Sequence, residues 1–193
     1  MGQNHARIYN EISNLVAVVD SNEVQGRDVA ERFGVNWYSD YREILDQVDA
    51  VTIAVPTFAH YKVAKKMAEA GIHLLVEKPL ASNCTEAEEI IKVSEKAGVT
   101  LAVGHIERHN PVVAYAKEAI RRGEWGDIIT LFSKRVSNFP DRISDVGVLF
   151  DLSIHDIDIS HYLAGSEVTS VYTAGGCIRA NNEDHVIITL EHK

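Results

Sequence analysis

Side chains that can move protons stand in two short segments of this sequence. Lys78 lies within the tripeptide Glu77-Lys78-Pro79, and Asp151 precedes His155 by one helical turn. Histidine exchanges protons near neutral pH, and a lysine ammonium can stabilise an alkoxide. A carboxylate on the same helix face can orient the imidazole or strengthen it as a base. These residue types predict acid–base chemistry on a hydroxyl group.

A second group of side chains suits the binding of a dinucleotide. Asp20 ends one apolar run, and Pro56-Thr57 follows another. His60 comes within the next helical turn. Such runs are typical of parallel strands, whose carboxyl ends meet at one edge of a sheet and bind ligands there. We therefore assign the cofactor site to Gly2, Asp20, Pro56, Thr57, His60, Glu77 and Lys78.

Several of these residues also have a purely structural interpretation. Asp20 could cap the helix that follows it or lie in its loop, and Thr57 could cap the next helix. Lys78 could be an ordinary solvated lysine. Asp151 could be a carboxylate favoured by a helix N-terminus, with an incidental histidine at position 155. The recurrence of these groups at strand ends favours the functional interpretation.

The elements that must position these residues alternate along the first half of the chain. Apolar runs of strand length separate longer segments of helical period, which predicts βαβ units and a parallel sheet. The predicted strands are residues 15–20, 51–55, 73–76 and 100–103. The predicted helices are 22–33, 58–70 and 85–97, and each is followed by a glycine that can end it.

The pattern changes after Pro111. A helix at 112–122 leads to strand candidates at 128–136, 168–174 and 186–191, with one further helix at 152–163. The last strand alternates apolar and polar residues, which fits a sheet with one solvated face. We therefore predict an α/β fold class. Residues 1–111 are expected to form a Rossmann-type doubly wound sheet, and 112–193 an α+β open-sheet domain.

The chain opens within a dinucleotide-binding pattern. Residues 1–5 start a helix whose Ile8 and Ile12 are expected to face the sheet. Asp20 follows Gly2 at nearly the spacing of about 20 residues that separates a phosphate-binding glycine from the acid on the ribose. We expect the first strand and the leading glycines of this pattern to be missing, and the chain as it stands to bind NAD(H) poorly.

Composition disfavours several classes of protein. The 193 residues include 19 basic and 28 acidic side chains, so nucleic acid and anionic membranes are poor partners. The sequence shows neither a signal peptide nor an apolar run of membrane-spanning length, which predicts a cytoplasmic protein. Cys84 and Cys177 fit neither a disulfide framework nor metal-ligand spacing, so we expect free thiols and no metal site.

Taken together, the motifs resemble those of the Gfo/Idh/MocA oxidoreductases over the whole chain. Residues 1–5 are similar to the second half of the family's GxGxMGxxH fingerprint. Pro56-Thr57 with His60 is similar to its TPxxxH element, and residues 76–81 match its EKP signature. Several ordered matches are more specific than any one of them.

The second domain carries two further likenesses. Asp151-x-x-x-His155 matches the family's DxGxH element, although Ser153 replaces the usual glycine. Residues 104–111 resemble the domain junction of the branch that includes UDP-N-acetylglucosamine 3-dehydrogenases, with His109 where phenylalanine is usual. Compared with the family, the chain is expected to lack its first strand and to stop short of its last ones.

The resemblance implies a dehydrogenase that transfers a hydride between NAD and a carbinol carbon of a sugar, nucleotide sugar or polyol. Lys78 would touch the substrate hydroxyl and the nicotinamide ribose, while Asp151 and His155 complete the catalytic set. NADP is disfavoured because Asp20 would repel its 2′-phosphate. The resemblance also implies a homo-oligomer, commonly a dimer. The loop at 137–148 is expected to shape the substrate pocket.

Two alternatives stay open at this point. One is a sensor on the same fold that binds a dinucleotide without catalysis. The other is an inactive, truncated product, because a parallel sheet without its central strand leaves backbone groups unpaired. The joint presence of Lys78, Asp151 and His155 favours the enzyme.

Overall fold

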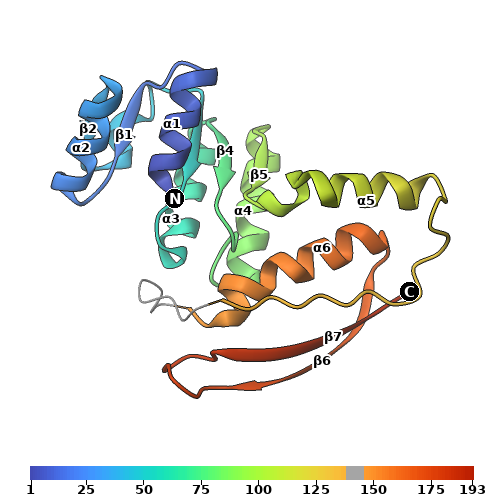
Figure 1. Ribbon diagram of the computed structural model, residues 1–193. Helices are drawn as coiled ribbons and strands as arrows, with labels where there is room; N and C mark the ends of the chain where they lie inside the picture. Colours follow the sequence, from blue (N-terminus) through green and yellow to red (C-terminus); the bar gives the residue numbers. More distant parts are fainter. Residues whose placement is uncertain (138–145) are drawn as a thin grey trace. The chain divides into compact units, whose positions relative to one another are not determined.

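The computed structural model describes residues 1–137 and 146–193, which form two compact units (Figure 1). The first unit is Met1–Gly104 and the second is His105–Lys193. The division falls after Gly104, close to the last strand of the first unit.

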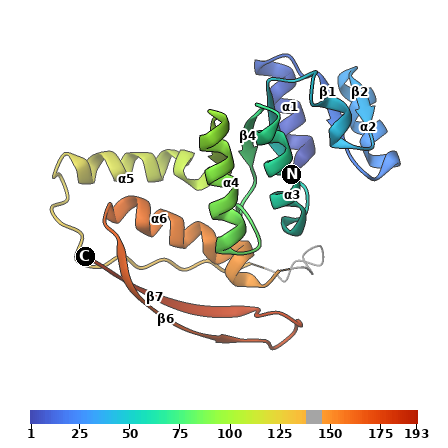
Figure 2. The ribbon, with the colours of Figure 1, turned by 180° about the vertical axis from the view of Figure 1, so that it is seen from behind.

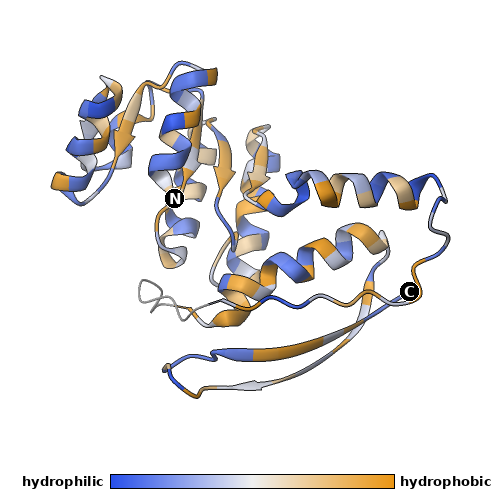
Figure 3. Ribbon diagram, viewed as in Figure 1, coloured by the Kyte–Doolittle hydropathy of each residue, from blue (hydrophilic) through white to orange (hydrophobic). Residues whose placement is uncertain are grey.

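All strand pairs of the first unit are parallel, as predicted. β1 (Ala17–Val19) pairs with β2 (Asn36–Tyr38). β3 (Ala50–Ile53), β4 (His73–Val76) and β5 (Leu101–Val103) form a three-stranded sheet with β4 in the centre. The apolar character of β1 and β4 is visible in Figure 3, and it explains why these runs form strands that are largely shielded from solvent. β2 was not predicted, because its three residues form too short a run for periodicity to identify.

The helices of the first unit are α1 (Gly2–Ile12), α2 (Glu23–Phe33), η1 (Tyr41–Ile44), α3 (Thr57–Glu69) and α4 (Cys84–Ala97). Two of them, α2 and α4, begin and end where capping residues predict. Asn22 and Asn83 cap α2 and α4 through their side chains, and glycines in the left-handed conformation end both helices. α1 contacts α2, whereas α3 packs beside α4; Figures 1 and 2 show these helices from opposite sides.

The prediction that Ile8 and Ile12 face the sheet is wrong. Ile12 is 73% exposed and Ile8 is 38% exposed, whereas Ala6 is buried. The face of α1 that meets the rest of the unit is set by polar contacts, because Thr52 Oγ1 donates to the Tyr9 hydroxyl at 2.8 Å. Within the described residues, the Ala6 side of the helix is therefore buried, while Ile8 and Ile12 are exposed.

The two sheets of the first unit are not hydrogen-bonded to each other within the described residues. The usual order of a doubly wound sheet places its first strand between the second and the fourth. β1 and β3 correspond to those two strands. The apolar core lies on the side of β3 and β4, and its most buried members are Ile53, Ala64, Met67, Ala68, Ile72, Leu74, Val76 and Ile90.

The second unit combines helices with an antiparallel hairpin. Its elements are η2 (Ile106–His109), α5 (Pro111–Arg121), η3 (Leu149–Ser153), α6 (Ile154–Ala164), β6 (Val168–Gly176) and β7 (His185–His192). β6 pairs with β7 from Val168 and His192 to Gly176 and His185, with one irregularity near Ser170. Side chains of β7 alternate between exposed and half-buried, which confirms the predicted one-sided strand.

The strand predicted at 128–136 is wrong. This segment has no regular secondary structure, and no described strand pairs with it. Side chains hold it instead, since Ser133 and Arg135 both bind Asp156 of α6. An apolar run favours a strand only where a neighbouring strand completes the hydrogen-bond ladder.

Gly26 offers a test of how tightly the first unit is packed around Asp20. A Cβ at this position would lie 2.2 Å from Trp37 Nε1, which donates to the backbone carbonyl of Asp20 at 3.0 Å. We expect Gly26→Ala to lower the free energy of unfolding by about 1–3 kcal/mol, because the indole ring must shift.

The matched control is Gly2→Ala, where a Cβ meets nothing within 4 Å. It should cost nothing, since alanine is the better helix former. Urea unfolding followed by circular dichroism measures both variants. Equal stability of Gly26→Ala and wild type would contradict the packing of Trp37 on α2.

Candidate functional site

In the first unit, the carboxyl ends of parallel strands carry the residues that the sequence assigned to a cofactor. Asp20 follows β1, Pro56-Thr57 follows β3, and Glu77-Lys78 follows β4. Parallel strands give these turns a common edge of their sheets, where open α/β folds bind their ligands.

The Asp20 carboxylate already has two partners. Oδ1 accepts from the backbone N–H of Asn22 at 2.8 Å, and Oδ2 accepts from the side-chain amide of Gln25 at 2.9 Å. These contacts belong to the loop before α2, whose N-cap is Asn22 and not Asp20. A carboxylate has about four acceptor positions, so both oxygens retain capacity for ribose hydroxyls.

The start of α1 fits an anion such as a pyrophosphate. Its N-cap, Met1, makes no side-chain capping bond, and its first turn contains no acidic residue. At Gly2 a Cβ would meet nothing within 4 Å, so the approach to the backbone is open. Uncapped N–H groups and the positive end of the helix dipole favour negative charge here.

Glu77 is a buried acid directly beside Lys78. It is 7% exposed, and its Oε1 lies 2.7 Å from His5 Nε2. Oε2 accepts from the backbone N–H of Lys78 at 3.2 Å. The His5 contact, helped by that N–H and by the charge of Lys78, holds the pKa of Glu77 below its usual value. A Cβ on Gly104 would lie 2.9 Å from Oε2, so this position favours glycine.

Glu77 is thus a support for the turn rather than an exposed ligand. Sequence reasoning did not assign this role, nor the parts that His5 and Gly104 play in it. His5 was noted only as part of a fingerprint, and its spacing from Glu77 carries no signal because the two lie far apart in the chain.

His60 is also turned away from solvent. It is 1% exposed, and both of its ring nitrogens face backbone carbonyls. Thr57, by contrast, is half-buried at the first position of α3. The N-cap of this helix is Pro56, which makes no side-chain capping bond, so Thr57 is not the cap that the structural interpretation required. Lys78 is half-buried and precedes a cis peptide bond to Pro79.

In the second unit, Asp151 and His155 occupy one continuous helical segment. Asp151 belongs to the π-helical turn η3 and His155 to the first turn of α6, so the helix begins earlier than predicted. Both residues are half-buried. Single π-helical turns occur frequently at functional sites.

Glu183, in the β6–β7 hairpin, fixes the start of this segment. Its carbonyl accepts from Val148 N at 2.8 Å, and its Oε1 accepts from Leu149 N at 3.2 Å. A Cβ on Gly147 would overlap the same carboxylate, which leaves glycine as the residue that fits. Neighbouring residues 138–145, most of the predicted substrate loop, lie outside the described residues.

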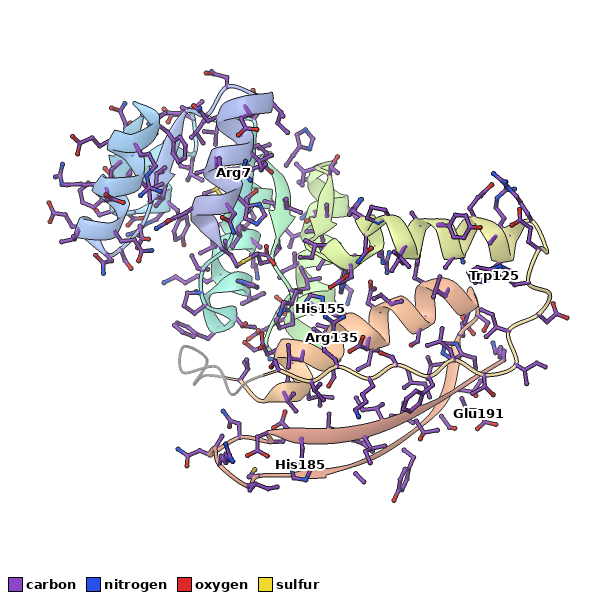
Figure 4. All side chains as sticks on the ribbon, in the orientation of Figure 1. Arg7, Trp125, Arg135, His155, His185 and Glu191 are labelled. Atoms are coloured by element: carbon purple, nitrogen blue, oxygen red, sulfur yellow. The ribbon has the colours of Figure 1, made fainter. Side chains whose placement is uncertain are left out.

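Arginines pair with the other acids of α6. Arg135 binds Asp156 through Nε at 3.0 Å, close to the start of the helix where His155 also lies (Figure 4). Arg108 forms a two-pronged contact with Asp158, with Nη2 at 2.6 Å and Nε at 2.9 Å. Sequence reasoning missed both pairs, because their members come from separate segments.

Two properties of the described residues bear on other kinds of site. Within them, no group of three or more His, Cys, Asp or Glu side chains is arranged to hold a metal ion. None of their helices has the length and apolar character needed to cross a membrane.

Known relatives match this chain over most of its length. It is 34% identical to the UDP-N-acetylglucosamine 3-dehydrogenase of Acidithiobacillus ferrooxidans, over 91% of the chain and 55% of that protein. It is 36% identical to the scyllo-inositol 2-dehydrogenase (NAD(+)) of Bacillus subtilis, over 82% of the chain and 48% of that protein. The chain therefore spans about half the length of these two relatives.

Solved structures of relatives share the fold. The crystal structure of the Acidithiobacillus ferrooxidans enzyme superposes with a TM-score of 0.90 at 32% identity, covering 100% of this chain and 62% of that one. The WlbA dehydrogenase of Bordetella pertussis, in complex with NADH and UDP-GlcNAcA, gives a TM-score of 0.86 at 26% identity, covering 100% and 65%.

Two family descriptions divide the chain between them. Residues 1–105 match the oxidoreductase family with an NAD-binding Rossmann fold, and residues 113–193 match the GFO/IDH/MocA C-terminal domain. These ranges correspond closely to the two compact units, and the chain belongs to the Gfo/Idh/MocA family of oxidoreductases.

Proposed function

We propose that this protein is an NAD-dependent oxidoreductase that acts on a carbinol carbon of a sugar, nucleotide sugar or polyol. The observation that carries the proposal is the set of strand-end turns in the first unit, which carry Asp20, Thr57 and Lys78, together with the uncapped start of α1. Relatives named for UDP-N-acetylglucosamine and for scyllo-inositol support the substrate class.

The residues of the first unit divide the binding of the dinucleotide among them. The Asp20 carboxylate accepts hydrogen bonds from the adenosine ribose hydroxyls, and the N–H groups at the start of α1 bind the pyrophosphate. The Thr57 hydroxyl adds a phosphate contact. When bound, NAD supplies the acceptor for the hydride.

Lys78 and the Asp151/His155 pair handle the proton of the substrate hydroxyl. His155 takes this proton as the hydride leaves the carbon, while Asp151 orients the imidazole. The Lys78 ammonium donates a hydrogen bond to the same oxygen and stabilises the alkoxide character that develops there.

The proposal extends to assembly and location. The β6–β7 hairpin exposes Tyr172 and Ile187, which are 69% and 71% exposed. They share one face, because Ile187 pairs with Ala174, two residues from Tyr172. Burial of this face against a second copy would cover these side chains, so we propose a homo-oligomer, commonly a dimer. We also propose a cytoplasmic location, as the composition of the sequence predicted.

Cofactor preference tests the assignment of Asp20. Its carboxylate should repel a 2′-phosphate, so NAD should be preferred and Asp20→Ser should relax the preference. NADH and NADPH titrations followed by fluorescence measure this, in the 193-residue chain and in a lengthened form with a strand and a Gly-x-Gly turn added before Met1. Asp28→Ser, on an exposed acid of α2 that pairs with Arg32, is the control and should change neither affinity. Equal affinity of wild type for both cofactors would remove Asp20 from the ribose site.

Turnover tests the proton-handling residues. His155→Ala should lower turnover by about 10²- to 10⁴-fold, the usual effect of losing a general base, and should leave NADH affinity unchanged. Lys78→Ala should lower turnover and also weaken cofactor binding. The two losses should not add, because both residues serve one step.

These rates are measured in the lengthened form with UDP-N-acetylhexosamines, hexoses and inositols as substrates. His161→Ala, on the same helix, is the control and should keep its turnover. A His155→Ala enzyme of near-normal turnover from pH 6 to 9 would exclude His155 as the base.

Glu77 gives a prediction with a defined pH dependence. Its depressed pKa means that the charged carboxylate stabilises the fold above the ordinary range near about 4.3, and that this stability is lost as the pH falls through the folded-state pKa. The groups that face the carboxylate are His5 and Lys78. Glu77→Gln should therefore lower the free energy of unfolding by about 1–3 kcal/mol at pH 7. At pH 3 the difference should be smaller than at pH 7.

Urea unfolding at both pH values measures this difference. Glu11→Gln is the control, since the pair of Glu11 with Arg7 is more than half exposed on both sides and contributes little. A destabilisation by Glu77→Gln that is the same at pH 7 and pH 3 would show that shape, and not charge, accounts for the effect.

A further inference from the structure

His60 lies in the first turn of α3 and contacts the turns that follow β3 and β4. It is one of the most deeply buried side chains of the described residues, at 1% exposure. The ring therefore has no open path to a ligand at the surface. A buried polar side chain is expected to form its hydrogen bonds with other groups of the protein.

The ring joins two turns that carry the candidate site. Its Nε2 lies 2.9 Å from the carbonyl oxygen of Val55, just after β3. Its Nδ1 lies 2.9 Å from the carbonyl oxygen of Pro79, just after β4. Carbonyl oxygens only accept hydrogen bonds, so the ring must be the donor. A neutral imidazole has one N–H and donates to one of the two carbonyls at a time, whereas an imidazolium donates to both.

The backbone hydrogen bonds between β3 and β4 end before the two turns that His60 contacts. The β3–β4 register ends at Ile53 and Val76, and Glu77 N then donates to Ile53 O at 2.9 Å. Beyond that point each turn contains a proline, Pro56 or Pro79, which has no N–H to donate. A side chain is therefore needed to join the two turns by hydrogen bonds, because the backbone of β3 and β4 does not.

We propose that His60 is a positioning residue, which ties the Val55–Thr57 turn to the Lys78–Pro79 turn and so fixes the direction of Lys78. The tie stands on the two contacts alone, while its consequence for turnover rests on the proposed function. His60 then acts through Lys78. It does not touch the dinucleotide, which differs from the cofactor-binding role predicted from the sequence.

The other side of the same turn has its own support. Glu77 Oε2 holds the backbone N–H of Lys78, and His5 holds Glu77. Loss of the His60 contacts should therefore loosen the turn from one side without unfolding the unit. The Pro79 side should become mobile, and the lysine should sample more directions.

The experiment compares His60→Phe, which keeps an aromatic ring but has no N–H, with His60→Gln, whose amide can still donate to one carbonyl. The matched control is His73→Gln. His73 stands at the opposite end of β4, where its Nδ1 accepts from Thr100 N at 2.9 Å. All variants are made in the 193-residue chain, and circular dichroism checks that each is folded.

The first readout is amide hydrogen exchange at Lys78 and Leu80, measured by NMR. We expect exchange to rise by at least about tenfold in His60→Phe, to rise less in His60→Gln, and to stay unchanged in His73→Gln. Unchanged exchange in a folded His60→Phe would overturn the tie. If His60→Phe does not fold, His60→Gln decides by the same criterion.

The second readout is kinetic and uses the lengthened form. His60→Gln should lower turnover by about tenfold to a hundredfold, as expected for a misplaced catalytic group, while KM for NAD stays within about twofold. A parallel loss of NADH affinity would overturn the positioning role and indicate contact with the cofactor. Absence of turnover in wild type would count against the proposed function alone, because the exchange readout still decides the tie.

Discussion

The buried carboxylate of Glu77 joins three elements that meet at the candidate site. It binds His5 of α1, holds the backbone of Lys78 after β4, and packs against Gly104 after β5. A charge in this position is stable only because donors surround it, and the lowered pKa of Glu77 reflects those donors. With His60 below the same turn, the position of Lys78 is determined by buried contacts and not by an exposed, freely moving loop.

The second unit follows the same principle with different residues. Glu183 fixes the π-helical turn that carries Asp151, and arginines pair with the acids that follow His155. Lys117 of α5 adds a hydrogen bond to the carbonyl of Tyr162 at 2.5 Å, near the end of α6. α6 is thus held at its start, along its length and at its end. Such support would serve His155 in its proposed role as general base, because small displacements of a catalytic group cost much of its effect.

Sequence reasoning succeeded where local chemistry determines structure. Asn22, Gly34 and Gly98 marked helix ends because caps depend on a few neighbouring atoms, and β4 was predicted at its observed bounds. It failed where the outcome depends on distant partners. The segment at 128–136 has strand-like composition but no paired strand among the described residues, and α1 turns toward Glu77 and Thr52 instead of following its apolar stripe. His60 and Glu77 were found by motif, yet their burial and supporting contacts could not be inferred from residue type.

The account centres on the claim that these strand-end turns hold NAD and direct Lys78 toward its nicotinamide end. A crystal structure of the protein grown with saturating NAD tests this claim most directly. The account predicts the adenosine ribose hydroxyls on the Asp20 carboxylate, the pyrophosphate at the start of α1, and the nicotinamide ribose beside Lys78. A dinucleotide bound away from these turns, or bound there without contact to Lys78, would contradict it.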